Sequence, residues 1–345
     1  MYFCLMFRVI LFFLITFSFV YNLSFSQNDS LPFNSYHERV VLSTSFSYKG
    51  APFNLQGSFD SINQLNYQAN LNLIHGIGVA YKWFSLNINY KLPNYTRSTE
   101  KYGKTKYFDV GLRFNLKKLY FSLNFTDYNG YGIKGADKLS DSLPVSPVGY
   151  YLNNNLKSWG LGLNVYYLIN PDLNMKAAIG AVSRYTGSAH GFYLRFTTSV
   201  YGISSERSLI PYEYLSSPHS SHKASSISAI DFGAVPGYAY LNNINGWQFG
   251  AFAGLGGVIQ AKSYQSEETS RSFLGLAPRF DLRIQGGYNV SNWFLMFNAT
   301  FDHSSIEFSH LQYNQLYFAF QLTYGYRFKE KEDKEVQNNF KLTRL

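Results

Sequence analysis

The chain has 345 residues, of which 19% are aromatic and only 15% are charged, and its formal net charge is +9 at pH 7. Apolar residues make up 46% of the chain, which excludes a disordered or low-complexity protein. The single cysteine, Cys4, excludes a disulfide-stapled scaffold and a thiolate zinc site.

The first 26 residues have the pattern of a secretory signal peptide. Arg8 precedes an apolar run that extends to Val20, and the small residues Ser24 and Ser26 stand before Gln27. This combination is typical of a cleaved Sec signal, and the apolar run is too short to span a bilayer as a helix. We expect residues 1–26 to be removed and residues 27–36 to form a short periplasmic segment.

From residue 37 to residue 328, apolar and polar residues alternate, which predicts β-strands whose two faces meet different surroundings. Between residues 84 and 92, for example, the even positions are apolar and the odd positions are polar. Short and long links follow one another in turn, as an antiparallel up-and-down barrel requires. We predict an all-β barrel of about twelve strands, with ten to fourteen possible, near residues 38–48, 65–81, 84–92, 105–116, 119–128, 157–168, 174–203, 226–241, 247–262, 272–290, 293–303 and 315–328. The seventh segment is too long for one strand, and we expect residues 186–191 to kink it.

A soluble β-sandwich would show the same alternation, so other features decide the surroundings. The export signal and the aromatic residues at the strand ends favour a transmembrane barrel in the outer membrane. The last strand ends in alternating aromatics at Phe328 and resembles the signal that the barrel-assembly machinery reads, so we expect that machinery as a partner during biogenesis. The charged segment 329–345 is expected to be a solvated periplasmic tail.

Several blocks of sequence resemble an uncharacterised Bacteroidota family of outer-membrane barrels, a domain of unknown function of the 4421 type. The blocks are residues 73–84, 91–93, 102–109, 188–189, 208–211 and 236–240. A basic segment expected before Ser188 is reduced here to Arg184. The resemblance spans about residues 36–328 and implies an exported barrel, but it brings no established activity.

Ser188 and His190 are the strongest catalytic candidates. A nucleophilic serine needs a nearby base and an acid that orients the base, and Asp109 or Asp281 could supply that acid. Residues i and i+2 of one strand lie too far apart for a good direct hydrogen bond, and the sequence holds no nucleophile elbow. The alternative interpretation is a glycine-flanked bulge with polar residues.

Two further motifs carry little chemistry. Residues 103–105 (Gly-Lys-Thr) resemble the end of a phosphate-binding loop, but Ser98 stands where that loop requires glycine. His219 and His222, with Glu213, are too few for a structural metal site. We therefore expect neither a cofactor nor a metal.

Charged residues on the polar faces of the strands are expected to line the lumen. Arg279, Asp281, Arg283 and Gln285 share one face of a predicted strand. Two interpretations remain open, namely ion pairs that brace the lumen and a basic constriction that selects anions. The other expected members are Asp109, Arg113, Arg195, Asp302 and Arg327.

The lysine and arginine side chains are spread over rims, loops and tail and are not gathered on one face. We therefore expect outer-membrane lipid and lipopolysaccharide as partners rather than nucleic acid. We predict a non-enzymatic barrel that passes small solutes or serves as a structural or assembly component. One alternative is a surface receptor or adhesin acting through residues 129–156 and 204–226. The other is a lipid-modifying esterase or deacylase at Ser188.

Overall fold

The computed structural model of the chain describes residues 31–59, 62–71, 73–92, 98–116, 118–138, 144–211 and 219–328. The predicted signal peptide, residues 27–30 and the predicted tail lie outside the described residues. Within these ranges, no helix is long and apolar enough to cross a membrane.

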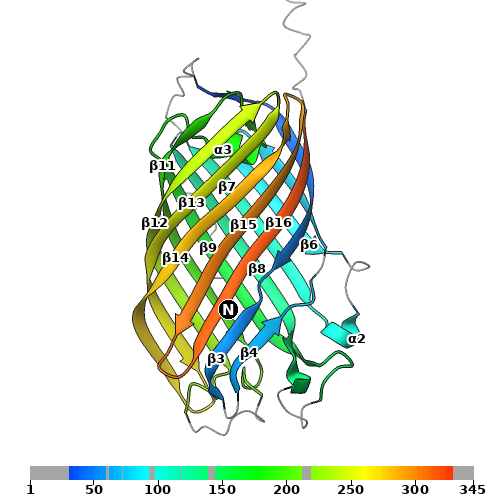
Figure 1. The fold of residues 1–345 in the computed structure, drawn as a ribbon, viewed down its shortest axis with the longest axis vertical. Helices are drawn as coiled ribbons and strands as arrows, with labels where there is room; N and C mark the ends of the chain where they lie inside the picture. The colour runs from blue at the N-terminus through cyan, green and yellow to red at the C-terminus, as the bar shows by residue number, and fades with distance from the viewer. Residues whose placement is uncertain are drawn as a thin grey trace, which may run out of the picture. The chain divides into compact units, whose positions relative to one another are not determined.

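In the described part of the chain, twelve antiparallel strands close into a ring (Figure 1). The ring closes because β16 pairs with β2 from Phe318 to Phe328. The predicted all-β up-and-down barrel is confirmed, and each predicted strand overlaps one strand of the ring. In ring order the strands are β2 (Val40–Gly50), β5 (Ile74–Tyr81), β6 (Phe84–Lys91), β7 (Lys106–Leu116), β8 (Leu119–Lys134), β9 (Tyr150–Leu168), β11 (Ala189–Ser204), β12 (Ser226–Ile244), β13 (Trp247–Gln265), β14 (Ser270–Asn289), β15 (Trp293–Glu307) and β16 (Gln312–Phe328).

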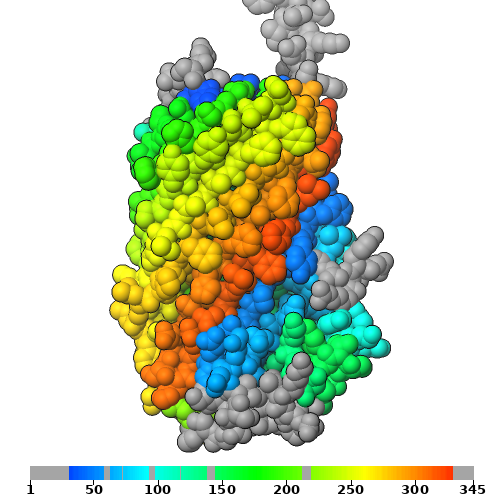
Figure 2. Space-filling model, in the orientation of Figure 1, coloured from blue at the N-terminus to red at the C-terminus, as the bar shows by residue number. Residues whose placement is uncertain are grey.

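The barrel wall forks near its long-loop end. β3 (Phe53–Phe59) and β4 (Ile62–Gln68) form a hairpin, whereas the sequence pattern predicted no strand between residues 48 and 65 and joined the end of β4 to β5 as one strand over 65–81. β3 extends the line of β2 along β16, and β4 pairs with β8. At this end the described strands therefore form a ring of ten, because β3 and β4 replace β2, β5, β6 and β7. Figure 2 shows the blue β3 and β4 against the orange-red β16.

Side chains seal the fork where the β-ladder is interrupted. The Lys91 ammonium donates to the carbonyls of Asn70 and Thr105, at 2.9 and 3.0 Å. The Asn70 amide donates to the carbonyl of Gly103 at 2.7 Å, and the Thr105 hydroxyl donates to that of Gly130 at 2.7 Å. These bonds satisfy backbone groups that have no strand partner at this point.

The polarity of the two faces reverses along the strands. On β13 the outward side chains of Trp247, Phe249 and Leu255 are exposed, Leu255 to 73%. Ten residues further along the same face, the outward residue is the polar Gln265, while its inward neighbour Tyr264 is buried. We call this exposed apolar section of the exterior the belt. Its side chains suit contact with lipid, and the polar section beyond it suits contact with water.

The ten-stranded section consequently has a polar exterior and an apolar core. On its exterior, Asn66 of β4 faces Asn54 of β3, and Asn314 of β16 donates a hydrogen bond of 3.2 Å to Asn54. Its core is a cluster of buried apolar residues that closes the lumen at the long-loop end, which we call the cap. The cap includes Phe53, Leu55, Leu65, Tyr67, Tyr128, Tyr131, Ile133, Leu156, Tyr201, Ile203, Ile227, Ile306 and Tyr313.

The opposite end is filled by residues 169–188, which we call the plug. The sequence pattern predicted a kinked strand over 174–203, but only β11 is a wall strand there. The plug instead holds α3 (Met175–Ile179) and β10 (Ser183–Tyr185), and β10 pairs with β1 (Phe33–Ser35). Figure 1 shows α3 within the barrel end that lies opposite β3 and β4. Two shorter helical turns, α2 (Thr99–Tyr102) and η2 (Ala136–Lys138), lie in the long connections.

We predict that a charge is tolerated on the outer face of β13 only beyond the belt. Leu255→Arg should cost about 2–4 kcal/mol of folding free energy in lipid, whereas Gln265→Arg, on the same face, should cost close to nothing. Urea titration of both variants in phosphatidylcholine vesicles measures the difference. Equal costs for the two would contradict the assignment of the belt.

Candidate functional site: a polar chamber inside the barrel

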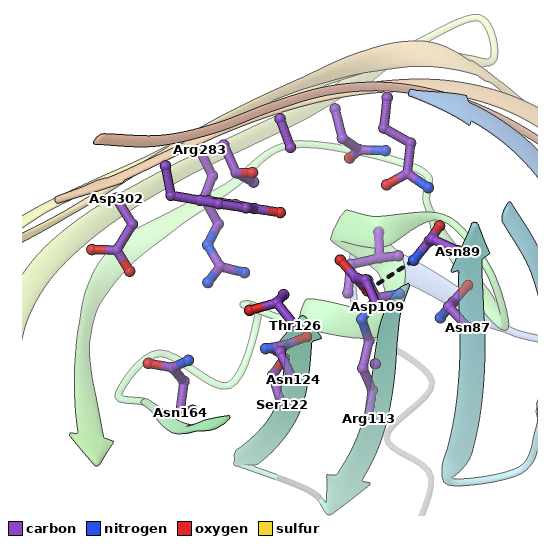
Figure 3. Close-up of a pocket in the computed structure, with 18 of the residues that line it drawn as sticks. Asn87, Asn89, Asp109, Arg113, Ser122, Asn124, Thr126, Asn164, Arg283 and Asp302 are labelled. Atoms are coloured by element: carbon purple, nitrogen blue, oxygen red, sulfur yellow. Dashed lines mark hydrogen bonds between the residues drawn. The ribbon is translucent and has the colours of Figure 1, made fainter. Parts of the chain in front are cut away.

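A cavity of about 360 Å³, which we call the chamber, lies inside the barrel (Figure 3). Tyr128 and Tyr201 of the cap are among its lining residues, as are Met175 and Lys176 of the plug. Between these limits the lining is mostly polar. It includes Ser85, Asn87, Asn89, Ser122, Asn124, Thr126, Asn164, Thr197, Asn298, Thr300, Gln321 and Thr323.

Asp281 is the centre of one charged group in the chamber wall. It pairs with Arg195 and Arg283, each at 3.0 Å, and accepts hydrogen bonds from the hydroxyls of Tyr166 and Tyr193, each at 3.1 Å. Its side chain is almost fully buried, so the two guanidinium groups compensate a charge that would be costly alone. The group joins β14 to β9 and β11 across the lumen.

Two further charged groups brace other parts of the wall. Arg279 pairs with Asp231, whose other oxygen accepts a hydrogen bond of 3.0 Å from Gln260. On β2, Lys49 pairs with Asp109 at 3.1 Å, and Asp109 also accepts bonds from Asn89 and Tyr107. Both pairs join strands that are not adjacent in the ring.

The plug has a local structure that its sequence specifies. Asn174 begins α3, and its side-chain oxygen accepts hydrogen bonds from the backbone amides of Lys176 and Ala177, at 2.9 and 3.2 Å. Gly180 ends the helix at φ +85°, a conformation that glycine adopts without strain. Five helical residues are too few to show a 3.6-residue period. The only sequence signal for this helix was its capping residues, Asn174 and Gly180.

Inward-facing polar side chains hold the plug by its backbone. Gln248 of β13 donates to the carbonyls of Ala177 and Ala178, at 2.6 and 3.0 Å. Arg327, which is fully buried, donates to the carbonyls of Gly180, Ala181 and Val290 and to Asn289. Apolar side chains of the plug, such as Met175 and Tyr185, also pack in buried clusters with wall residues, so the plug is held by both kinds of contact.

The structure places eight of the nine predicted lumen residues in the chamber lining: Asp109, Arg113, Arg195, Arg279, Asp281, Arg283, Gln285 and Asp302. Arg327 does not, because the plug fills the lumen at its level and takes its hydrogen bonds. Lys176 lines the chamber and was missed, since it belongs to the predicted kinked strand.

The predicted catalytic residues do not come together. Ser188 and His190 are exposed, and the His190 imidazole is hydrogen-bonded to the hydroxyl of Tyr238 at 2.6 Å. Asp109 lies inside the chamber, paired with Lys49. Within the described residues, no hydrogen bond joins Ser188 to His190.

The exterior carries a chain of polar groups that the sequence analysis missed. Hydrogen bonds of 2.8 Å join the Thr44 hydroxyl to Nε2 of His75 and Nδ1 of His75 to the Tyr90 hydroxyl. The three residues lie on β2, β5 and β6, with a phenol where a catalytic triad has a carboxylate. Only the pairing register brings them together, since they are 31 and 15 residues apart in the chain.

The histidines of the 204–226 connection pack with a third one. The rings of His219 and His310 are 3.9 Å apart, and those of His219 and His222 are 5.9 Å apart. Glu213 lies outside the described residues. In the described ranges, no group of three or more histidines, cysteines or carboxylates is placed to hold a metal.

Burial lowers the pKa of the Lys176 ammonium from 10.5 to about 8. We predict that this group loses its proton between pH 7 and 9, so the chamber becomes less positive as pH rises. Because the unfolded chain keeps the ordinary pKa, this lysine makes folding more favourable as pH rises from 8 to 10.5.

NMR titration of the barrel with ¹³C-labelled lysines measures this pKa. One lysine signal should titrate near pH 8 and be absent from the Lys176→Met variant. A titration near pH 10.5 for every lysine would contradict the burial of Lys176 in the closed plug.

No curated protein matches the sequence. Similar solved structures include the COG4313 outer membrane channel from Pseudomonas putida F1, at 8% identity and a TM-score of 0.38, covering 88% of this chain and 100% of that one. The P. putida toluene transporter TodX has 7% identity and a TM-score of 0.29, covering 85% and 91%. OmpT, an outer membrane protein of Vibrio cholerae, has 7% identity and a TM-score of 0.31, covering 89% and 100%.

At these identities and TM-scores, we draw no functional inference from the three structures. The family comparison is more informative, because a match extends over residues 27–328, which is most of the chain. It confirms the resemblance noted in the blocks of sequence from residue 73 onward. The chain belongs to the family described as Domain of unknown function (DUF4421).

Proposed function

We propose that the protein is an outer-membrane β-barrel that passes small polar solutes through a chamber closed at rest. The observation that carries this proposal is the polar chamber of about 360 Å³ inside a barrel with an apolar exterior. A barrel that served only as a structural element could fill its lumen with side chains, as small barrels do, instead of keeping a cavity. Neutral hydrogen-bonding groups around the cavity suit a hydrated solute.

The positions of the short turns and the long connections give the orientation of the barrel in the membrane. In outer-membrane barrels the short turns face the periplasm and the long connections face outward. The plug then lies at the periplasmic end, and the cap projects from the outer surface. The apolar belt would contact outer-membrane lipid, and the cap would lie at the level of the lipopolysaccharide headgroups.

Passage requires both the plug and the cap to move, because each closes one end of the lumen. The cap is a continuous apolar core built on the wall strands, so opening it would expose many buried side chains to water. The plug also buries apolar side chains, but its strand β10 pairs with β1 and not with a strand of the ring, so the plug can move without breaking the wall. Water can replace the hydrogen bonds to its carbonyls when it moves. We therefore expect the plug, at the periplasmic end, to move more readily than the cap.

Removal of the plug should remove one of the two closures of the lumen. We predict that a mature chain lacking residues 172–186, joined by a short glycine-serine link, opens more often in planar bilayers than the intact chain, because only the cap still closes the lumen. Heat-modifiable migration on a gel confirms folding before each recording. A folded, plug-deleted barrel that stays silent would contradict passage.

A single substitution provides the matched control. Arg327→Leu leaves the plug carbonyls of Gly180 and Ala181, and that of Val290, without this donor, and it should raise the opening frequency because the plug is then held less firmly. Arg39→Gln removes bonds at the same barrel end to Ser291 and Asn292, which are outside the plug, and should leave the frequency unchanged. Equal effects of both would mean general loosening of the barrel end.

A further inference from the structure

We propose that the chamber binds small anionic solutes, and that Arg113, Lys176 and Gln285 hold the anionic group. This inference rests on the proposed passage of polar solutes and names the class of solute. It follows from the charges of the chamber, from the polar groups left without partners, and from where those groups lie.

The charges of the chamber do not balance. Six cationic side chains line it, against the three carboxylates Asp109, Asp281 and Asp302. A fourth carboxylate, Asp231, lies behind Arg279. The chamber therefore has two more positive than negative charges. Because it is enclosed by the barrel wall, solvent screens these charges only weakly. The cations are Lys49, Arg113, Lys176, Arg195, Arg279 and Arg283.

The ion pairs identify which two cations are in excess. Four of the six, Lys49 and the three arginines of the Asp281 and Asp231 groups, are paired with carboxylates. For Arg113 and Lys176, the described part of the chain offers no ion pair and no side-chain hydrogen bond. Their donors are available to a ligand in the chamber.

Gln285 provides a neutral donor beside them. It lines the chamber and is only 6% exposed, yet its side-chain nitrogen has no hydrogen-bond partner among the described residues. A buried amide donor without an acceptor has lost its bond to water and gained none in return, which disfavours the empty chamber. A bound anion would supply the acceptor.

Arg113 and Gln285 lie at a similar level of the chamber, near the plug. Arg113 lies three residues from the end of β7, and Gln285 lies four residues from the end of β14, both at the short-turn end. At about 3.3 Å per residue along the strand, both lie roughly 10–13 Å from that end. In the twelve-strand ring, β7 and β14 are six strands apart in either direction, so the two residues lie on opposite sides of the lumen. Lys176 belongs to the plug, which closes the chamber at this end.

The surrounding groups define the remainder of the solute. Asn87, Asn124, Asn164 and Asn298 line the chamber with groups that both donate and accept hydrogen bonds. Figure 3 shows Arg113 and Arg283 entering the cavity from different strands, with Asn124 and Thr126 close by. A cavity of this volume is near the lower limit of ligand pockets, which fits a small hydrophilic carboxylate or phosphate.

Equilibrium dialysis of the refolded mature barrel in detergent tests this inference. Inorganic phosphate and succinate are the anionic probes, and choline is the cationic probe. We expect saturable binding of at least one anion and none of choline. Binding of phosphate alone assigns a phosphorylated solute, and binding of succinate alone assigns a carboxylate.

Matched variants locate the site. Arg113→Gln and Lys176→Gln should each weaken anion binding at least tenfold, and Gln285→Leu several-fold. Lys106→Gln, on the opposite face of the same strand as Arg113, should have no effect. If Arg113→Gln fails to show heat-modifiable migration, Arg113→Lys replaces it and should retain binding.

Two results would overturn the anion site: no saturable anion binding by the folded barrel, or binding that the three chamber variants leave unchanged. Either result, combined with conductance of the plug-deleted barrel, would reject the site and retain passage. Anion binding by a barrel whose plug-deleted form stays silent would reject passage and retain the site.

Discussion

The reversal of polarity along the strands determines how this barrel is built. In the bilayer core no water is available, so every backbone group must be paired within a closed ring and the outward side chains must be apolar. Twelve strands meet this requirement over the belt, where Leu255 and its neighbours are exposed. Beyond the belt the outward residues become polar, which suits contact with water, and the inward residues form an apolar core. The fork marks this change, because the ring narrows from twelve to ten strands there.

The chamber is a consequence of the same arrangement. Between the fork and the plug, the inward face of the strands is the polar face, so charged side chains face one another in a confined space. Most of them pair, and the pairs join strands that are distant in the ring. The two ends are closed differently. The cap consists of wall strands packed on an apolar core, whereas the plug is a connection inside the lumen that combines apolar packing with hydrogen bonds from Gln248 and Arg327 to its backbone carbonyls.

Much of the fold could be predicted from sequence because alternation is a local signal. Residues 84–92 alternate as predicted, and β6 covers all but the last of them. The β3–β4 hairpin was missed because polar residues such as Asn54 made β3 resemble a loop, and because the predicted strand over 65–81 joined the end of β4, with Asn66, to β5. Asn54 and Asn66 form the polar exterior of the two strands. The plug was missed because α3 has only five residues, and its burial depends on Gln248, Asn289 and Arg327, which are distant in sequence. The face that bears Arg327 could be predicted, but what fills the lumen at its level could not.

The most direct test of this account is accessibility of single cysteines along the barrel exterior. The sequence has one cysteine, Cys4, within the predicted signal peptide, so each introduced cysteine would be the only one in the mature chain. In proteoliposomes, cysteines at Asn54, Asn66 and Asn314 should react with a membrane-impermeant maleimide, whereas cysteines at Leu255, Phe297 and Leu322 should not. Uniform reactivity along the strands, or protection of the asparagine positions, would contradict the reversal of polarity at the fork.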